Sequence, residues 1–387
     1  MGGRIPYLSA RLQGYSTTIF AEMSALALAT NSINLGQGFP DSDGPESIKR
    51  AAIRAIEDGR NQYPPGIGIS ELRWAIAGHQ QRFRGLTFDP DREILVTAGA
   101  TEAIAACLLA LCETGDEVVM FEPYYDSYAA CTAMAGAQRR VVQLRAPEWS
   151  FDPDELESLI TDRTRLIMVN TPHNPTGKVF SLEELQVIAD VSQRHDLLVV
   201  TDEVYEHLVF ESAHISLASL PGMSERTITI SSAAKTFSFT GWKVGWACAP
   251  AALIAAIRTA KQFLTYVNAG PFQYAIAEGL NANDDYLTDA AEVLRGKRDF
   301  LSAGLAAAGF EVYTSRGTFF LTTDISKVTD EDSFTFCREL PGRCGVVAIP
   351  SSVFYDDQQA GQHLVRWMFS KRDEVLSEAV ERLKRLG

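Results

Sequence analysis

Short runs of apolar and β-branched residues alternate with longer, helix-like stretches between about residues 46 and 270. Each run has the length and composition of a buried strand, and the stretches between the runs have helical periodicity. The runs occupy residues 93–97, 117–121, 166–170, 197–201 and 227–230. This alternation predicts βαβ units, and therefore an α/β domain with a mostly parallel central sheet that helices cover on both faces.

The helix-like stretches also carry start signals and indicate where the large domain ends. Ser-Leu-Glu-Glu at 181–184 matches a capping box, which predicts a helix over residues 181–195. A polar–apolar periodic stretch from about residue 275 through Arg298 predicts one long helix that leads into a smaller α+β domain. We expect three regions: an N-terminal arm and small-domain segment (1–45), a large domain (46–275) and a C-terminal small domain (276–387).

Composition narrows the classes of function. The 387 residues carry a formal net charge of −14, which argues against nucleic acid or an anionic membrane as a partner. The six cysteines include no C-x-x-C pair and lie mostly in apolar runs, so we expect free thiols and neither a disulfide framework nor a metal site. Without a signal-peptide pattern or an apolar run of transmembrane length, we expect a cytoplasmic protein.

Polar and small residues follow four of the predicted strands, at the edge of a parallel sheet where ligands bind. Gly99, Ala100 and Thr101 come after the first strand and open a helix, whose exposed N–H groups and positive dipole end suit a phosphate. Asn174 follows the third strand between two prolines, which restrict the backbone around it. An ordinary loop is the alternative for this segment.

Asp202 and Tyr205 come directly after the fourth strand. A carboxylate at a buried strand end needs a cation, and a protonated pyridinium ring would be one. The alternative for Asp202 is the N-cap of a helix. Asn174, Asp202 and Lys235 are separated by 28 and 33 residues. Each interval accommodates one helical crossover, so the three side chains should converge at successive strand ends.

Lys235 stands among small and hydroxyl-bearing residues just after the fifth strand. A lysine at a strand end that points into a crowded pocket loses hydration, which lowers its pKa and frees the amine for Schiff-base chemistry. Ser232 and Lys243, on either side of it, would supply a hydroxyl and a cation for a phosphate. For an isolated Ser-x-x-Lys, the alternative is a surface lysine whose stem packs on apolar neighbours.

Four linked motifs together resemble the class I and II aminotransferases of pyridoxal-phosphate fold type I. They are Asn-Pro-Thr-Gly at 174–177, Asp-Glu-Val-Tyr at 202–205, Ser-x-x-Lys at 232–235 and the late Arg366. The match covers nearly the whole chain. The segments 36–41, 61–63 and 241–246 resemble the branch of kynurenine/glutamine, methionine and bacterial N-succinyldiaminopimelate aminotransferases. Aspartate aminotransferases commonly have an arginine where this chain has Lys243, so we expect a single-point contact with phosphate there.

The resemblance implies a pyridoxal 5′-phosphate cofactor and a role for each candidate residue. Lys235 would bind the cofactor as a Schiff base and later move the Cα proton of the substrate, while Asp202 would pair with the pyridinium nitrogen. Asn174 and Tyr205 would hydrogen-bond the ring oxygen. Tyr125 would stack on the ring, unless it is simply a core aromatic. The phosphate would be bound by Gly99, Ala100, Thr101, Ser232 and Lys243.

The resemblance also implies the substrate contacts and the assembly. Arg366 would bind the α-carboxylate of an amino acid or 2-oxo acid, aided by Asn174 and the backbone at Gly36. An ion pair with an acidic residue of the chain is the alternative for this arginine, which lies among apolar neighbours. In the family, the active site is built at a two-fold interface, so we expect a homodimer in which Tyr63 completes the neighbouring site.

The activity expected from the family is transfer of an α-amino group between an amino acid and a 2-oxo acid by a ping-pong mechanism, with 2-oxoglutarate and glutamate as the partner pair. Segments 62–66 and 100–106 look most like the N-succinyldiaminopimelate group of lysine biosynthesis. N-succinyl-LL-2,6-diaminopimelate is therefore the first expectation for the substrate. A kynurenine, glutamine or methionine aminotransferase, or a cysteine-conjugate β-lyase on the same scaffold, stays open. The aromatics that could shape a large side-chain pocket, or equally lie in the core, are Tyr15, Phe20, Tyr124, Tyr266 and Phe354.

Two further classes fit the chain less well. A ligand-sensing domain of a transcriptional regulator would carry a basic winged-helix segment, which this acidic chain lacks. A nicotinamide-dependent oxidoreductase would have G-x-G-x-x-G after a strand, and no such motif follows any predicted strand.

Overall fold

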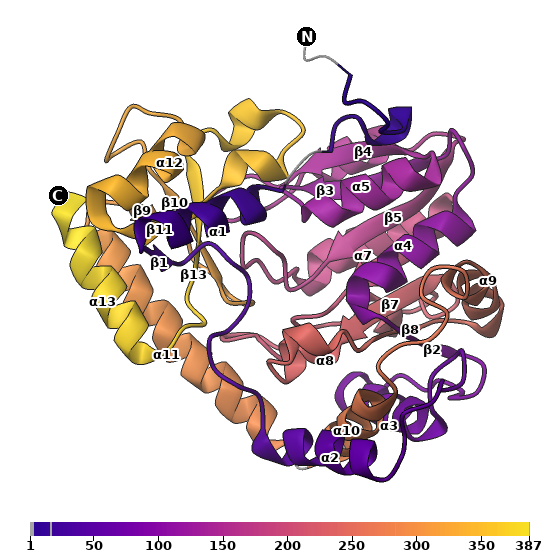
Figure 1. The fold of residues 1–387 in the computed structure, drawn as a ribbon. Coiled ribbons are helices and arrows are strands. Elements are labelled where there is room, and N and C mark those ends of the chain that lie inside the picture. Colours follow the sequence, from indigo (N-terminus) through magenta and orange to yellow (C-terminus); the bar gives the residue numbers. More distant parts are fainter. Residues whose placement is uncertain (1–3, 16–17, 283, 387) are drawn as a thin grey trace.

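The computed structural model describes residues 4–15, 18–282 and 284–386, which form a large and a smaller part (Figure 1). A seven-stranded sheet of order β2-β8-β7-β6-β5-β3-β4 forms the centre of the large part. Its strands run parallel except β8, which is antiparallel to both of its neighbours. The strands are β2 (Ile94–Thr97), β3 (Glu117–Glu122), β4 (Gln138–Gln143), β5 (Thr164–Asn170), β6 (Leu198–Asp202), β7 (Thr227–Ser232) and β8 (Gly245–Cys248).

The five predicted strands are confirmed to within two residues at each end, whereas β4 and β8 were not predicted. β4 reads Gln-Arg-Arg-Val-Val-Gln and lies at the sheet edge with its first residues exposed, so it lacks the apolar run of a buried strand. β8 reads Gly-Trp-Ala-Cys, which has no β-branched residue although all four residues are buried. Tertiary contacts, and not local composition, make these two segments strands.

Helices pack on the central sheet and build most of the remaining structure (Figure 1). The predicted helix over 181–195 is confirmed as α7, and its capping box is present. The Ser181 hydroxyl accepts from the Glu184 N–H, and the Glu184 carboxylate accepts from the Ser181 N–H. The helices are α1 (Ile19–Thr30), α2 (Glu46–Glu57), α3 (Ser70–Arg84), α4 (Gly99–Leu111), α5 (Asp126–Ala135), α6 (Pro153–Ser158), α7 (Leu182–Arg194), α8 (Ala233–Thr236), α9 (Ala251–Lys261), α10 (Gly270–Asn281), α11 (Asp285–Ala307), α12 (Ser333–Cys344) and α13 (Asp373–Leu383). Short 3₁₀ helices lie at Ala10–Leu12, Leu217–Ser219, Thr240–Trp242, Ser351–Phe354, Gln358–Gly361 and Lys384–Leu386.

Alternate residues of the central strands pack on opposite faces of the sheet. Leu166 and Met168 of β5 belong to a core that they share with α4, α5 and α9. Ile167 and Val169 point to the other face, where α7 covers the sheet. None of these four side chains is more than 1% exposed, which accounts for the continuous apolar composition of β5. A third core joins α2, α3 and α10 to the end of the sheet formed by β2 and β8.

The predicted long helix from about residue 275 through Arg298 is wrong, because two helices occupy this region. α10 ends at Asn281, and α11 begins at Asp285. The sequence Asn-Ala-Asn-Asp-Asp at 281–285 favours caps and turns over helix interiors, which ends the first helix. Each helix buries some of its apolar residues, so the polar–apolar pattern continues beyond the break and conceals it.

The smaller part is built around an antiparallel sheet of order β12-β13-β10-β9. A separate parallel pair, β1 with β11, places the end of the N-terminal arm beside the C-terminal strands. The domain boundaries at about residues 45 and 275 stay a prediction, and α10 spans the second of them. The strands of this part are β1 (Ile33–Asn34), β9 (Glu311–Val312), β10 (Phe320–Asp324), β11 (Val346–Val347), β12 (Ile349–Pro350) and β13 (Leu364–Met368).

Within the described ranges, no helix has both the length and the apolar composition of a membrane span. All six cysteines are buried and unpaired. Burial raises the pKa of Cys112 to about 12, so this thiol stays protonated and unreactive at neutral pH.

Gly245, the first residue of β8, allows the reversed strand to approach the first turn of α4. A Cβ on this residue would lie 2.6 Å from the carbonyl carbon of Gly99 and 2.8 Å from the nitrogen of Ala100. Because both contacts are with backbone atoms, a side chain here would have to displace β8 or the start of α4.

We predict that Gly245→Ala lowers the free energy of unfolding by roughly 1–3 kcal/mol, the usual cost of forcing extra volume into a packed interior. Urea denaturation of the variant and the wild type measures the difference. Gly241→Ala is the matched control, because its added Cβ meets no atom within 4 Å. The control should change stability by less than about 0.5 kcal/mol. Equal losses in the two variants would mean that the close approach at Gly245 is not the cause.

Candidate active site

A cavity of about 370 Å³ opens at the carboxyl ends of β5, β6 and β7. Register aligns these ends, because Asn170 of β5 pairs with Asp202 of β6, and Asp202 pairs with Ile230 of β7. The cavity therefore lies where a parallel sheet binds its ligands. The candidate residues that line it are Gly99, Ala100, Thr101, Tyr125, Asn174, Asp202, Tyr205, Ser232, Lys235, Lys243 and Arg366.

Lys235 reaches the cavity from α8, the single helical turn that follows β7. Its Nζ donates to the backbone oxygen of Gly38 at 3.0 Å and lies 5.1 Å and 5.8 Å from the ring centroids of Phe319 and Tyr205. Burial lowers the pKa of Lys235 to about 8, with Arg366 adding to the effect and Asp202 opposing it. The side chain is thus a cavity lysine and not the surface lysine of the alternative interpretation.

Asp202 is the last residue of β6, and the chain then turns instead of entering a helix. The alternative role as a helix N-cap is therefore wrong. Its carboxylate accepts from the Tyr128 hydroxyl at 2.7 Å and from the Val204 N–H at 3.3 Å, and no described residue forms an ion pair with it. Burial raises the pKa of Asp202 to about 6, although the Tyr128 hydrogen bond and the charge of Lys235 favour the carboxylate.

Asn170, which sequence reasoning treated only as a strand residue, holds the Asn174 loop in place. Its Oδ1 accepts from the Asn174 N–H at 2.7 Å, and its Nδ2 donates to the backbone oxygens of Asp202 at 2.8 Å and Pro172 at 3.1 Å. The Asn174 side chain in turn accepts from Arg366 Nη1 at 2.9 Å. The loop is therefore part of an ordered hydrogen-bonded unit that joins β5, β6 and β13.

Arg366 on β13 is a buried cation with only neutral acceptors. It is 1% exposed, and besides Asn174 its guanidinium donates to the Gly36 backbone oxygen, at 2.8 Å from Nη2. The guanidinium carbon lies 4.0 Å from the ring centroid of Phe320, and Nε has no hydrogen-bond partner. No carboxylate among the described residues pairs with it, so the internal ion pair of the alternative interpretation is absent. Burial lowers the pKa of Arg366 to about 10, still far above neutrality.

The groups of a candidate anion site lie at the start of α4. Gly99 has a φ of +76°, and a Cβ there would lie 3.1 Å from Nζ of Lys243, so the glycine makes room for this ammonium group. The cavity is bordered here by the N–H groups of the first turn of α4, by the Lys243 ammonium group and by the buried Ser232. Asn268 holds the two segments together, because its Nδ2 donates to the backbone oxygens of Lys243 at 2.9 Å and Thr97 at 3.2 Å.

Two candidate residues lie outside the cavity walls. Gly36 contributes only its backbone oxygen, to Arg366. Tyr63 is 80% exposed, and its ring packs edge-on against Tyr266 at 5.6 Å. A single chain therefore does not bring Tyr63 to the other candidates.

Of the five aromatic residues proposed for the side-chain pocket, only Phe20 lines the cavity. Phe354 is fully buried beside the Arg366 guanidinium, and Tyr124 is buried and bonded to Asp356. Tyr15 is half-buried and accepts a hydrogen bond from Arg139, and Tyr266 is exposed. Among the residues with direct contacts to the candidates that sequence reasoning missed are Asn170, Tyr128 and Phe320. A polar residue at the end of an apolar strand could have indicated Asn170, whereas Tyr128 and Phe320 have no such signal.

Comparisons with known proteins give one consistent family. The model of aminotransferase classes I and II matches residues 30–383. A probable N-succinyldiaminopimelate aminotransferase of Mycobacterium tuberculosis is 52% identical over 389 residues, which cover 97% of this chain and 98% of that protein. Methionine aminotransferase of Escherichia coli is 41% identical over 377 residues and 97% of each chain.

Solved structures agree with the sequence comparison. N-succinyldiaminopimelate aminotransferase from M. tuberculosis matches with a TM-score of 0.96 and 52% identity over 98% of this chain and 100% of that one. Aspartate aminotransferase from Thermus thermophilus matches with a TM-score of 0.91 and 33% identity over 99% and 100% of the two chains. The fold is therefore the one that the motifs implied. This chain belongs to the class I and II aminotransferases, a family of enzymes that depend on pyridoxal phosphate.

Proposed function

We propose that this aminotransferase takes the amino group of N-succinyl-LL-2,6-diaminopimelate and transfers it to 2-oxoglutarate, in a ping-pong reaction that serves lysine biosynthesis. The observation that carries the proposal is the 52% identity, over 97% of the chain, to the mycobacterial relative named for this substrate. Methionine is the second candidate, because the relative named for it is 41% identical over a similar length.

The cavity fits the phosphate end of the cofactor. Its volume of about 370 Å³ is within the usual range of small-molecule sites. Residues 99–101 offer helix N-terminal N–H groups, Ser232 a hydroxyl and Lys243 an ammonium group, and these are the donors that bind phosphate in proteins. We assign the phosphate to this end of the cavity.

The opposite wall fits the pyridine ring. Asp202 has no cationic partner among the described residues, so its buried carboxylate would hold the protonated ring nitrogen. Asn174 and Tyr205 would bond the ring oxygen, and Tyr125 would cover the ring face. Burial raises the pKa of Tyr125 to about 12, so this side chain is neutral at working pH.

Bound pyridoxal phosphate supplies an electron sink for the bond that breaks at the substrate Cα. Lys235 is the proposed base, and its Nζ would take the proton from the substrate Cα and deliver it to the C4′ carbon of the cofactor. Because burial lowers the pKa of Lys235 to about 8, about a tenth of the amine is unprotonated at pH 7, far more than for an ordinary lysine. Asp202 keeps the ring nitrogen protonated throughout.

Arg366 would orient every substrate through the α-carboxylate. Two of its N–H groups bond Asn174 and Gly36, while Nε lacks a partner and the guanidinium charge lacks an anion. A substrate carboxylate would supply that anion in a place where the planar guanidinium can bind it at two points. The aromatic ring of Phe320 fixes the plane of the guanidinium from one side.

We further propose that the enzyme acts as a cytoplasmic homodimer. Tyr63 and Tyr266 form an exposed aromatic pair, 80% and 56% exposed, which is unusual unless another chain covers it. In the dimer, Tyr63 would reach the phosphate end of the partner's cavity. The six free cysteines are consistent with a reducing compartment.

With 2-oxoglutarate as acceptor, N-succinyl-LL-2,6-diaminopimelate should have a kcat/KM at least about tenfold above those of methionine, kynurenine and glutamine. Glutamate production by the purified enzyme measures each donor. Lys235→Ala is the control and should produce no glutamate from any donor. A higher kcat/KM for methionine would support the second candidate and overturn the proposed substrate.

Asp202→Asn should separate stability from catalysis. The loss of the carboxylate weakens the electron sink, so kcat should fall by roughly 100-fold or more with little change in KM. The folded-state pKa of Asp202 is raised from its ordinary 3.8 to about 6. Its ionisation therefore disfavours the fold increasingly between about pH 4 and pH 6, and by about 3 kcal/mol at most above pH 6, for two pKa units. The cofactor-free variant should accordingly be more stable than the wild type by about 1–3 kcal/mol at pH 7.

The pH dependence is the internal control for this variant. At pH 4, Asp202 is protonated in the folded chain and about half ionised in the unfolded chain, so the stability gain should fall below about 1 kcal/mol there. Chemical denaturation of the cofactor-free proteins at pH 4 and pH 7 measures this difference. A change in KM alone, or a stability gain that is the same at both pH values, contradicts the proposed role.

Arg366→Lys should reduce kcat/KM for every amino donor and for the 2-oxoglutarate acceptor alike, by roughly 10–100-fold. The positive charge stays, while the two-point contact with the carboxylate is lost. Steady-state kinetics with each substrate measures the effect. Arg298→Lys is the matched control, because Arg298 of α11 is a largely buried arginine that forms ion pairs with Glu211 and Asp299. A loss confined to one donor would place Arg366 in the side-chain pocket instead.

A further inference from the structure

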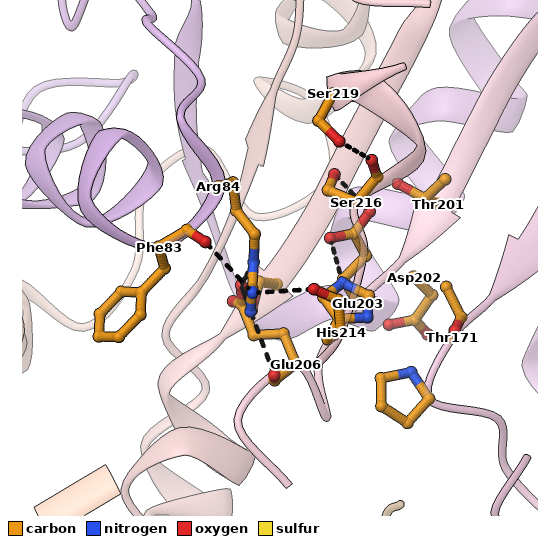
Figure 2. A network of polar contacts seen from close by, with 12 residues as sticks. Phe83, Arg84, Thr171, Thr201, Asp202, Glu203, Glu206, His214, Ser216 and Ser219 are labelled. Atoms are coloured by element: carbon orange, nitrogen blue, oxygen red, sulfur yellow. Dashed lines mark hydrogen bonds and ion pairs between the residues drawn. The ribbon is translucent and has the colours of Figure 1, made fainter. Parts of the chain in front are cut away.

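Two buried carboxylates flank Tyr205 in the turn that follows β6. Glu203 is 0% exposed, and Glu206 is 2% exposed. Figure 2 shows both side chains. Glu203 accepts from His214 Nε2 at 2.8 Å and from the Ser216 hydroxyl at 2.9 Å. Neither glutamate lines the candidate active-site cavity. Both side chains therefore contact other residues of the protein and not a ligand in that cavity.

Glu206 connects this turn to two other elements. Its Oε1 accepts from the Ser231 hydroxyl of β7 at 2.6 Å. Its Oε2 accepts from Nη2 and Nε of Arg84 at 3.0 Å and 3.2 Å, and Nη2 also donates to the Glu206 backbone oxygen at 3.1 Å (Figure 2). Arg84 is the last residue of α3, so one side chain joins α3, β7 and the Tyr205 turn.

The charge of Glu206 is well compensated. Burial alone would raise the pKa of this carboxyl, but the Arg84 guanidinium, aided by the Ser231 hydrogen bond, lowers it below the ordinary value. Glu206 is therefore ionised at working pH. A buried carboxylate bonded at both oxygens holds its neighbours in one arrangement, because any shift leaves charge without a partner.

His79, Glu206 and His207 also have the spacing of a metal site, with ligand atoms within 4.8 Å of one another. Two observations argue against that role. Both oxygens of Glu206 are already engaged, one of them by a guanidinium that would repel a metal cation. The two imidazoles bond each other directly, with 2.7 Å between their Nε2 atoms. The cluster is better described as a hydrogen-bonded network around Glu206.

We propose that Glu206 is a positioning residue that holds Tyr205 against the cofactor ring. Through Ser231, it ties the Tyr205 turn to the strand that continues into Ser232 and Lys235, so the two sides of the site keep one relative position. Tyr205 lines the cavity, while Glu206, the next residue, does not line it and bonds to Arg84 and Ser231 instead. The inference rests on the proposed bond between Tyr205 and the ring oxygen.

The test is a pH titration of the visible absorbance of the cofactor-loaded enzyme. Tyr205→Phe removes a hydrogen bond to the ring oxygen of the cofactor. It should raise the pKa observed in the titration of the visible absorbance by about one unit, which corresponds to about 1.4 kcal/mol. Glu206→Gln should raise it in the same direction, because Tyr205 is no longer held. In the double variant, the shift should equal that of Tyr205→Phe alone, since Glu206 acts through Tyr205.

A direct charge effect would give the opposite sign. Loss of a negative charge near the site favours the deprotonated form, so it would lower the observed pKa and persist in the Tyr205→Phe background. Either that result or additive upward shifts overturns the inference. If Tyr205→Phe itself leaves the titration unchanged, the proposed contact of Tyr205 with the ring fails, which is a separate outcome.

Two further variants separate positioning from general damage. Ser231→Ala removes one bond of Glu206 and keeps the Arg84 pair, so it should give a smaller shift of the same sign even where Glu206→Gln fails to fold. Glu117→Gln is the matched control, because Glu117 is a fully buried carboxylate bonded to Arg140, Arg163 and Thr161 at the start of β3. The control should lose stability without any shift in the titration, and a shift equal to that of Glu206→Gln would overturn the inference.

Discussion

Three ionisable side chains surround one cavity without full neutralisation, and the active site depends on this constraint. Within the described part of the chain, the hydrogen-bond acceptors of Arg366 are one amide and one backbone oxygen, and the donors to Asp202 are a hydroxyl and a backbone N–H. Burial raises the pKa of Asp202 and lowers the pKa of Arg366 and of Lys235, so it favours the neutral form of each group. Such an arrangement costs stability in the protein alone, and a cationic ring and an anionic carboxylate would complete it.

The remaining fold keeps these groups in place. Parallel register brings the ends of β5 and β6 to the same edge, and Asn170 ties the Asn174 loop to both. The reversed strand β8 packs Gly245 against the start of α4, which carries the candidate anion site. The Glu206 network connects the Tyr205 turn to β7 through the hydrogen bond from the Ser231 hydroxyl to Glu206.

Much of the fold and most of the site could be predicted from the sequence, because apolar runs identify strands and the site residues follow those runs at crossover spacing. The errors share one cause. β8 is a strand because of its neighbours, and the break between α10 and α11 lies in a pattern that continues across it. Local composition reports burial well, but it does not report which element provides the burial.

The sequence by itself determined the class of enzyme, since four motifs in order match the class I and II aminotransferases, the family to which the chain belongs. Only the tertiary structure decided how these charges are partnered. Tyr128 meets Asp202 across 74 residues, and Arg366 meets Gly36 across 330. The pKa of a buried group depends on the loss of water and on atoms within a few ångströms, and those atoms come from segments whose proximity the linear chain does not encode locally.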